Sequence, residues 1–312
     1  PDPEMLYLST QHAECLMRLK YAIFSHKGGA LLVSDTAGNG KTSILARLQN
    51  DLRDYYGGRV RVAFIDHPTL TPIEMLGEIA RQLGGELHTS EKIRSLNYLR
   101  DRLFAFYNDN IKVVVIVDEG QMLKDRPDIL GELRILLNFC VSDAFLLTFV
   151  FSGQKPLDGV LREMPEFWQR LPVRFFLKNL DFDDTRSLIQ FRLRKVGASE
   201  EIFSADAYEG IYNYSEGCPR IICSLADLCL LVGYAKRSQD RFRGSVRRLP
   251  RHGILRGQLP LFRVYQEPRR RHPRAGPARR RPVRLRLRTR LVPGARPGGT
   301  RRGSRDPGGA RS

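Results

Sequence analysis

The sequence predicts an α/β protein with a five-stranded parallel sheet flanked by helices, followed by a small C-terminal helical lid. Three observations support this fold class. Strand-like apolar runs alternate with helix-like segments over residues 10–177, a glycine-rich turn separates the first strand from a helix, and strand-like runs stop near Asp181. Alternation of this kind is typical of a parallel sheet with helices on both faces.

The five strands are expected where apolar or β-branched runs occur, at residues 30–34, 60–65, 112–117, 145–151 and 173–177. The intervening helices are expected where apolar residues recur at helical spacing, at residues 10–25, 41–55, 72–84, 91–107, 127–141 and 156–170. The run Val113–Val117 is continuously apolar, which is typical of a central strand that is covered on both faces.

Only helical patterns follow residue 180, and they predict the lid. Asp181 can cap a helix that closes at Gly197, and Ser204 can cap the next one. A third helix is expected over residues 218–235. We therefore expect three parts: an α/β domain at 1–178, a helical lid at 179–238 and an Arg/Pro/Gly-rich tail at 239–312.

A glycine-rich turn follows the first strand and opens a helix. Phosphates bind where backbone N–H groups converge at a helix N-terminus, and Gly38 and Gly40 leave that approach open. Lys41 would supply charge to the β- and γ-phosphates, and the Thr42 hydroxyl would ligate Mg²⁺. A glycine turn that only caps a helix would not explain Lys41-Thr42. The predicted nucleotide-binding residues are Thr36, Ala37, Gly38, Asn39, Gly40, Lys41, Thr42 and Ser43.

One residue departs from the usual pattern G-x-x-x-x-G-K-[ST], because Asp35 occupies the first glycine position. A carboxylate about 8 Å from a polyphosphate would repel it by roughly 2 kcal/mol at an effective dielectric constant near 20. Uncompensated, that repulsion would weaken binding by about thirtyfold. We therefore expect Asp35 to lower nucleotide affinity.

Two carboxylates, Asp118 and Glu119, end the central strand. Ligands of open α/β sheets bind at the carboxyl ends of the strands. There, Asp118 would hold Mg²⁺ through water and Glu119 would polarise the attacking water. The alternative is a solvated acidic turn, which the preceding phosphate loop disfavours.

These segments, in their order, resemble the AAA+ ATPases of the ExeA/GspA secretion type and the related TniB-like transposition ATPases, within the ORC1/DEAH-type AAA+ ATPase domains. The resemblance runs from Pro1 to about Lys236. Besides the phosphate loop, it rests on an entry segment, a D-E-A-Q-like run, a G-Q-P-x-L-like run, a Q-R-L segment before a strand and an S-x-G-x-P-R-like run. Their positions are Pro1–Ser9, Asp118–Gln121, Ser152–Leu157, Gln169–Leu171 and Tyr214–Arg220.

The resemblance implies an AAA+ P-loop NTPase fold, ATP and Mg²⁺ as cofactors, and ATP hydrolysis. It also implies roles for individual residues. Arg170 would be an arginine finger that completes the site of a neighbouring subunit in a homo-oligomer, or else a surface arginine at a helix end. Arg220 would be the sensor-2 arginine of the lid. Ser152 or Gln154 would be sensor 1, and His67 would restrain the catalytic Glu119.

The last 72 residues differ in composition from the rest. Residues 241–312 hold 23 Arg, no Lys, one Glu and one Asp, a formal charge of +21, so the total of +18 leaves −3 for residues 1–240. Such an Arg/Pro/Gly-rich segment cannot bury enough surface to order itself. Two interpretations stay open: a tail that binds polyanions such as nucleic acid, or the out-of-frame translation of GC-rich DNA.

Other sequence features bear on location. The apolar runs are shorter than the roughly 20 residues of a membrane span, and no secretory signal begins the chain. The five cysteines form no C-x-x-C pair, which suits reduced thiols in a cytosol. We expect a cytoplasmic protein without a transmembrane segment, peripheral to a bacterial inner membrane.

The expected function is that of an ATP-binding and ATP-hydrolysing motor or switch in secretion or envelope assembly, with assembly proteins as partners. Two alternatives remain: a DNA-associated regulator of transposition, and a nucleotide-gated scaffold with little turnover, which Asp35 favours. Catalysis is assigned to Glu119, Asp118 and Arg170, and metal binding to Thr42 and Asp118.

Overall fold

The computed structural model describes residues 3–85 and 91–235, all of which belong to one compact unit, Pro1–Leu255. The predicted tail, residues 239–312, lies outside the described residues.

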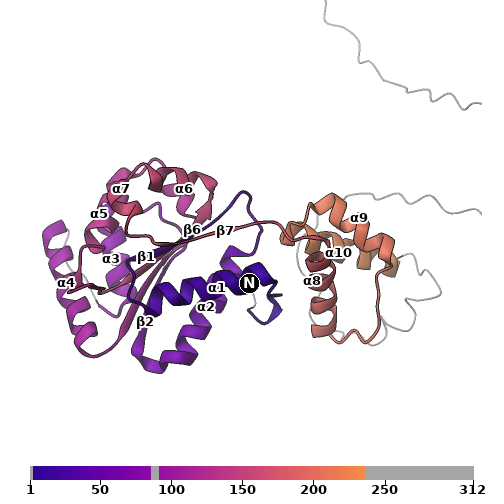
Figure 1. Cartoon of the computed structure of the whole chain (residues 1–312), viewed down its shortest axis with the longest axis horizontal. Helices are drawn as coiled ribbons and strands as arrows, with labels where there is room; N and C mark the ends of the chain where they lie inside the picture. The colour runs from indigo at the N-terminus through magenta and orange to yellow at the C-terminus, as the bar shows by residue number, and fades with distance from the viewer. Residues whose placement is uncertain (1–2, 86–90, 236–312) are drawn as a thin grey trace, which may run out of the picture. The chain divides into compact units, whose positions relative to one another are not determined.

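Five parallel strands form one sheet in the order β2-β3-β6-β1-β7 (Figure 1). Their bounds are β1 Gly29–Ser34, β2 Val60–Ile65, β3 Lys112–Val117, β6 Thr148–Gln154 and β7 Val173–Leu177. The two strands that precede the glycine-rich turn and the acidic pair, β1 and β3, are separated by β6, which pairs with both. The predicted five-stranded parallel sheet is confirmed, and its carboxyl ends bring the two motifs to one edge.

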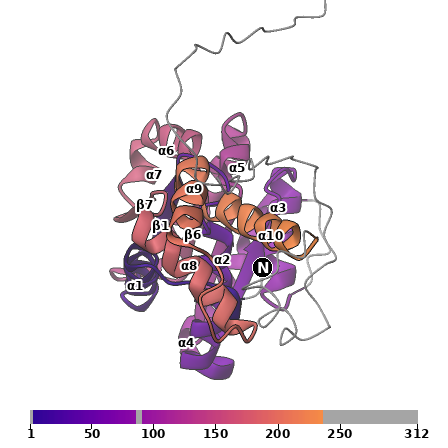
Figure 2. The ribbon, with the colours of Figure 1, turned by 90° about the vertical axis from the view of Figure 1, so that its right-hand side faces the viewer.

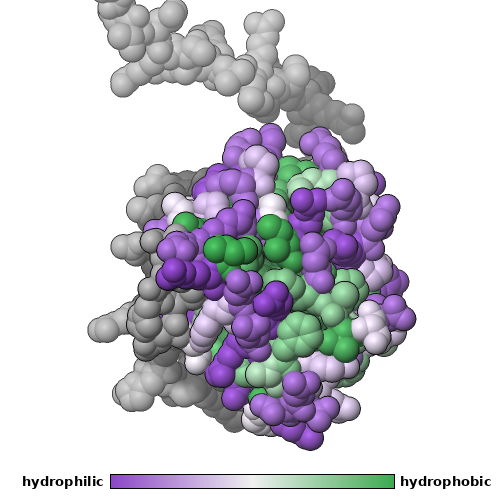
Figure 3. Space-filling view, turned by 90° about the vertical axis from the view of Figure 1, so that its left-hand side faces the viewer, coloured by the Kyte–Doolittle hydropathy of each residue, from purple (hydrophilic) through white to green (hydrophobic). Residues whose placement is uncertain are grey.

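Helices cover both faces of the sheet (Figure 1). One face packs against α1 (Thr10–Phe24) and α2 (Lys41–Tyr56), and the other packs against α3 to α7. The bounds on that second face are α3 Pro72–Gln82, α4 Lys92–Asn108, α5 Pro127–Leu136, α6 Lys155–Arg162 and α7 Pro165–Trp168. Figure 3 looks at the side where α4 and α5 lie, and apolar side chains reach the surface there only in patches between hydrophilic ones. Short 3-10 turns are η1 Pro3–Met5, η2 Gly57–Arg59 and η3 Gly120–Leu123.

Several helices begin at side chains that satisfy their free backbone N–H groups. Ser9 caps α1, and the predicted caps Asp181 and Ser204 begin α8 and α9, each by accepting a bond from the N–H three residues later. Thr71 begins α3 in a reciprocal capping box with Glu74. The local sequence thus sets these helix starts.

The predicted elements between residues 127 and 151 have wrong boundaries. The helix expected over 127–141 ends at Leu136, and a short hairpin of β4 (Cys140–Val141) and β5 (Ala144–Phe145) follows. Its turn contains Ser142 at a φ of 53°. The next strand consequently runs over Thr148–Gln154 instead of 145–151. A continuous apolar run has no periodicity that marks where a strand begins. From the sequence, the residues of the hairpin therefore resembled the end of the preceding helix and the start of the following strand.

The helix expected over 156–170 divides into α6 and α7. The break falls at Met164, which precedes Pro165. The proline ring disfavours a helical backbone in the residue before it. The sequence contained this signal, but the apolar spacing across it suggested a single helix.

Residues after 180 form only helices, as predicted. α8 (Phe182–Lys195), α9 (Ala205–Ser215) and α10 (Pro219–Ala235) pack on one another around a small apolar core (Figures 1 and 2). Gly197 follows α8 in a left-handed conformation, at a φ of 93°. The domain boundaries at 178 and 238 remain predictions. Within residues 3–85 and 91–235, no helix is both long and apolar enough to cross a membrane.

Candidate nucleotide-binding site

The glycine-rich turn links the carboxyl end of β1 to the start of α2. Gly38 and Gly40 have φ values of 97° and 96°, in the left-handed region that suits glycine. Gly40 is also the N-cap of α2, and no side chain caps this helix. The first N–H groups of α2 therefore have no side-chain acceptor, which is the arrangement that binds an anion.

Lys41 is buried at the first position of α2. Its Nζ donates to Ser34 Oγ at 2.6 Å and to the Thr36 carbonyl at 3.5 Å, and no ion pair joins it to a carboxylate among the described residues. Burial lowers the pKa of Lys41, while the nearby charges of Asp118 and Glu119 oppose the shift. An anion beside this ammonium would form the direct ion pair that neither carboxylate makes with it.

The acidic pair lies next to this lysine. Thr42 Oγ1 donates to Asp118 Oδ2 at 2.8 Å, although 76 residues separate them in the sequence. The other Asp118 oxygen accepts from the Glu119 N–H at 2.9 Å. Asp118 is 3% exposed, so its charge acts in a poorly solvated place.

Side-chain alternation explains why these groups converge. Ser34, Asp118 and Ser152 each stand two residues beyond a residue that is buried against α1 and α2. Side chains two apart share a face of a strand. The three polar groups therefore continue the α2-facing rows of β1, β3 and β6 at the edge where α2 begins.

Ser152 and Gln154, the two sensor-1 candidates, lie within β6 rather than in a turn after it. Ser152 is fully buried, and its Oγ has no hydrogen-bond partner. Buried hydroxyls are rarely left unpaired. An unpaired hydroxyl and a lysine without a carboxylate partner, beside Thr42 and Asp118, fit a triphosphate with Mg²⁺. Among the described residues, no group of three or more His, Cys, Asp or Glu side chains could hold a metal ion. A metal ion at this site would therefore need phosphate oxygens among its ligands.

The catalytic candidate Glu119 has a φ of 51°, an uncommon conformation for a residue with a side chain. Its carboxylate accepts a bond of 2.5 Å from Gln121 Nε2. No hydrogen bond joins it to His67, which is exposed in the loop after β2. The structure therefore places Gln121, and not His67, against this glutamate.

Sequence reasoning missed His12, a buried residue of α1. Its Nε2 lies 3.1 Å from the Asn39 carbonyl and its Nδ1 lies 2.6 Å from Ser9 Oγ. Because a carbonyl can only accept, Nε2 carries the proton and Ser9 donates to Nδ1. Burial lowers the pKa of His12, which favours the neutral ring. Through its bond to the Asn39 carbonyl, this ring holds the glycine-rich turn against α1. A histidine on an apolar helical face was the only sequence signal.

Comparisons with known proteins agree with this geometry. The family model described as AAA domain matches residues 25–161. These residues of the chain are thus similar to an AAA domain. It is 30% identical to the General secretion pathway protein A of Aeromonas hydrophila over 249 residues, which are 79% of this chain and 44% of that protein. The chain thus spans less than half the length of this relative.

Solved structures show the same fold as this AAA domain and its lid. The Aeropyrum pernix ORC2 protein in its ADP form matches with a TM-score of 0.55 and 18% identity, over 78% of this chain and 68% of that one. Drosophila ORC bound to DNA matches with a TM-score of 0.54 and 18% identity, over 75% and 60%. The AAA+ fold class predicted from the sequence is confirmed.

Within the described chain, the lid residues contact the glycine-rich turn of the AAA domain. The Arg220 N–H donates to the Gly38 carbonyl at 3.2 Å, and a Cβ on Gly38 would lie 2.8 Å from the Arg220 Cβ. Asn39 Nδ2 donates to Asn179 Oδ1 at 2.9 Å, and Asn179 donates to the Glu216 carbonyl. The backbone bond of Arg220 to Gly38 places the exposed Arg220 side chain near Lys41. After burial, the positive charge of Arg220 also contributes to the lowered pKa of Lys41.

Other residues of the predicted site differ in their surroundings. Thr36 and Ala37 are exposed at the tip of the turn, while Ser43 is half-buried in α2. Asn39 is buried and accepts a bond from Thr36 Oγ1. Asp35 is exposed, and its carboxylate lies 3.8 Å from Lys155 Nζ. The neighbouring cation offsets part of the repulsion expected from Asp35.

Arg170 lies at the opposite end of β1 from Lys41. Its carbonyl oxygen lies 2.9 Å from where a Cβ on Gly28 would be, just before β1 begins. A six-residue strand is about 20 Å long, so Arg170 is remote from Thr42 and Asp118 of its own chain. Any contact of Arg170 with a nucleotide would have to be made in another subunit.

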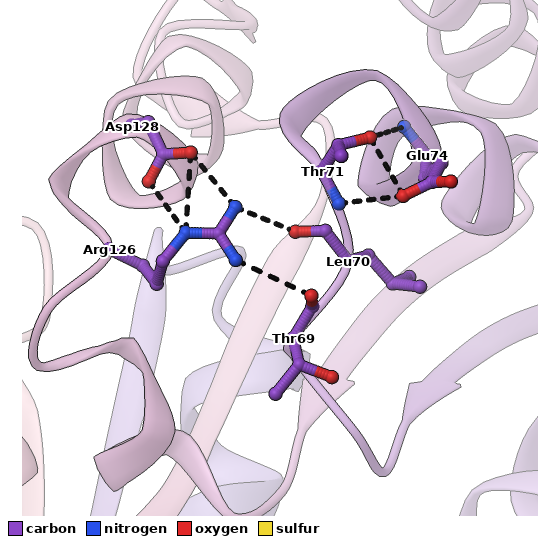
Figure 4. Close-up of polar contacts among 6 residues, drawn as sticks. All are labelled: Thr69, Leu70, Thr71, Glu74, Arg126 and Asp128. Carbon is purple, nitrogen blue, oxygen red and sulfur yellow. Dashed lines mark hydrogen bonds and ion pairs between the residues drawn. The ribbon is translucent and has the colours of Figure 1, made fainter.

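A polar cluster braces the loops after β2 and β3 (Figure 4). The Arg126 guanidinium donates to the Leu70 carbonyl at 2.9 Å and to the Thr69 carbonyl at 3.4 Å, and binds the carboxylate of Asp128. The capping box of α3 begins at the next residue, Thr71. Arg126 thereby ties the start of α5 to the loop that leads into α3.

Proposed function

We propose that this AAA domain binds and hydrolyses ATP. The N–H groups of residues 36–43 and the Lys41 ammonium would bind the phosphates, and Arg220 would respond to them from the lid. Glu119 would accept a proton from the attacking water. General-base catalysis of this kind contributes about 10²- to 10⁴-fold to a rate.

Mg²⁺ would be held by Thr42 and by Asp118 through water, and when bound it would neutralise phosphate charge. The observation that carries the proposal is the 2.8 Å bond between Thr42 Oγ1 and Asp118 Oδ2 beside a buried lysine without a carboxylate partner. Two residues 76 apart in sequence meet there, with the chemistry that a metal-bound triphosphate requires.

The experiment compares ATP binding and turnover in the wild type, Lys41→Ala and Glu119→Gln. Lys41→Ala should lose both binding and hydrolysis. Glu119→Gln should keep ATP binding and lose about 100-fold or more of kcat, because the amide cannot take a proton. EDTA should abolish turnover by the wild type. Equal turnover by the wild type and Glu119→Gln would refute the assignment of Glu119.

We further propose that the hydrolysis serves as a motor or switch in secretion or envelope assembly, at the cytoplasmic face of a bacterial inner membrane. The support is the similarity to General secretion pathway protein A over 79% of this chain. Genes for secretion or envelope synthesis beside this one would agree with the proposal, whereas a neighbouring transposase gene, together with ATP-dependent binding of duplex DNA, would contradict it.

The protein would act as a homo-oligomer in which Arg170, remote from the phosphate loop of its own chain, reaches the site of a neighbouring subunit. The arginine would then enter a neighbouring site, where it would stabilise charge on the transferred phosphoryl group. Sedimentation with and without ATP measures whether the nucleotide changes the oligomeric state, and a monomer under both conditions would refute this part.

A further inference from the structure

Gln121 makes a polar bridge between the turn that holds Glu119 and the end of β6. Its Nε2 donates to Glu119 Oε2 at 2.5 Å, and its Oε1 accepts the backbone N–H of Gln154 at 3.0 Å. Gln121 and Gln154 lie 33 residues apart in sequence. One half-buried amide therefore joins two strands of the sheet beyond their paired region.

The orientation of the amide is chemically determined. An ionised carboxylate can only accept a hydrogen bond and a backbone N–H can only donate one, so the NH₂ group must face Glu119 and the oxygen must face Gln154. Among the standard side chains of this length, glutamine alone supplies both a donor and an acceptor. Leucine would supply neither, and an ionised glutamate would supply no donor.

Close packing holds the bridge in place. A Cβ on Gly153 would lie 2.9 Å from Gln121 Oε1 and 3.0 Å from the Gln121 backbone nitrogen. A Cβ on Gly120 would lie 3.1 Å from the Ser152 carbonyl oxygen and 2.8 Å from a Leu157 methyl group. The turn of η3 thus lies directly on the end of β6, with no room for a side chain larger than that of glycine at either position.

The orphaned Ser152 hydroxyl lies on the same strand, two residues before Gln154. A change in the position of the β6 end would therefore reach both the phosphate side of the site, through Ser152, and the carboxylate of Glu119, through Gln121. A rigid strand is a physical connection of the kind that coupling between groups requires.

We infer that Gln121 is a positioning residue that sets the place of the Glu119 carboxylate from the end of β6. The inference rests on the proposed ATP hydrolysis and deepens it. Gln121 touches neither phosphate nor water in this role. It acts through Glu119, and a displacement of that carboxylate by about 1 Å is enough to cost on the order of 100-fold in rate.

The test measures kcat and KM for ATP in the full-length wild type, Gln121→Leu and Gln121→Glu, with Met122→Leu as the matched control. Met122 belongs to the same turn and is 44% exposed. We expect kcat to fall about 10- to 100-fold in both Gln121 variants, with KM within about twofold of the wild type, since the phosphate contacts are untouched. Met122→Leu should match the wild type.

A second readout needs no turnover. Hydrogen exchange at the backbone N–H of Gln154 should be faster in Gln121→Leu, which removes the Oε1 acceptor of this N–H. The exchange rate should not change in Met122→Leu. Should Gln121→Leu fail to fold, Gln121→Glu decides, because it keeps the side-chain shape and an acceptor for Gln154 but offers Glu119 a like charge.

The outcomes separate the two proposals. Wild-type kcat in a folded Gln121 variant overturns the positioning role, and so does a rise in KM without a fall in kcat. A wild type that does not hydrolyse ATP overturns the proposed function and the catalytic part of the inference together. In that case, hydrogen exchange at the backbone N–H of Gln154 still tests the bridge. An unchanged exchange rate in Gln121→Leu overturns the bridge.

Discussion

At the scale of single residues, the site depends on side chains whose partners come from distant parts of the chain. Lys41 and Thr42 stand at the start of α2, yet their polar contacts are with Ser34 and Asp118. His12 and Asp35 show the same dependence, because the contacts that decide their effects, with Asn39 and Lys155, are tertiary. Two predictions follow from those contacts.

His12 should make stability depend on pH. Burial holds its pKa in the folded protein below the value near 6.5 that it has when unfolded. Below pH 6.5 the unfolded chain therefore binds a proton that the folded protein does not, and stability is lost as the pH falls towards the folded pKa. The loss can reach about 1.4 kcal/mol per pH unit for one proton.

Urea unfolding at pH 7.5, 6.5 and 5.5 checks this, with His12→Gln, which keeps an amide donor for Asn39, and His67→Gln as the exposed control. The wild type should lose more stability on acidification than His12→Gln, and His67→Gln should follow the wild type. Parallel curves for the wild type and His12→Gln would contradict a buried neutral His12.

Asp35→Asn should tighten binding of Mg-ATP only a few-fold, less than the roughly thirtyfold of an uncompensated carboxylate. Asp35 is exposed and Lys155 lies 3.8 Å away, so solvent and the neighbouring ammonium both screen its charge. Titration calorimetry on Asp35→Asn, Lys155→Gln and the double variant measures the coupling. A thirtyfold gain in Asp35→Asn would show that Lys155 offsets nothing.

At the scale of elements, the loops at the carboxyl edge are held by specific polar clamps. Gln121 connects η3 to β6, and Arg126 connects the start of α5 to the loop before α3. The sheet brings these loops to one edge, and the clamps set their positions there. The Arg126 clamp carries the prediction for this scale (Figure 4).

Arg126→Gln should lower the free energy of unfolding more than Arg134→Gln does, because two backbone carbonyls lose a charged donor. Arg134→Gln is the matched control, since Arg134 forms an ion pair with Glu166 in which both side chains are exposed. Such surface pairs contribute about 0–1 kcal/mol. Denaturant unfolding measures both variants, and equal effects would mean that the clamp is no stronger than a surface pair.

At the scale of the whole molecule, an active site would need a second subunit. Arg170 lies at the far end of β1 from Lys41, so each proposed site would combine the phosphate loop of one subunit with Arg170 of another. The lid contributes from the same chain, through Arg220 and the bonds of Asn39 with Asn179.

Mixing two inactive variants tests this arrangement. Arg170→Ala and Lys41→Ala should each lose about 10³-fold or more of the ATPase rate when alone. An equal mixture should regain part of the activity, because the intact loop of one variant meets the intact arginine of the other. A mixture as inactive as its components would place Arg170 outside the site.

The sequence by itself determined the α/β class, the five-stranded parallel sheet, the helix caps Asp181 and Ser204 and the two motifs, because apolar periodicity, capping side chains and glycine-rich turns act locally. The sequence did not predict the strand and helix boundaries between residues 127 and 170, because apolar spacing does not reveal the hairpin at 140–145 or the break before Pro165.

Only the tertiary structure decided which groups meet. The contacts of His12 with Asn39, of Lys155 with Asp35 and of Gln121 with Glu119 each join residues whose proximity depends on how strands and turns pack. Hydrogen bonds and ion pairs act over a few ångströms, and only the register and packing of the whole fold bring distant segments within that range.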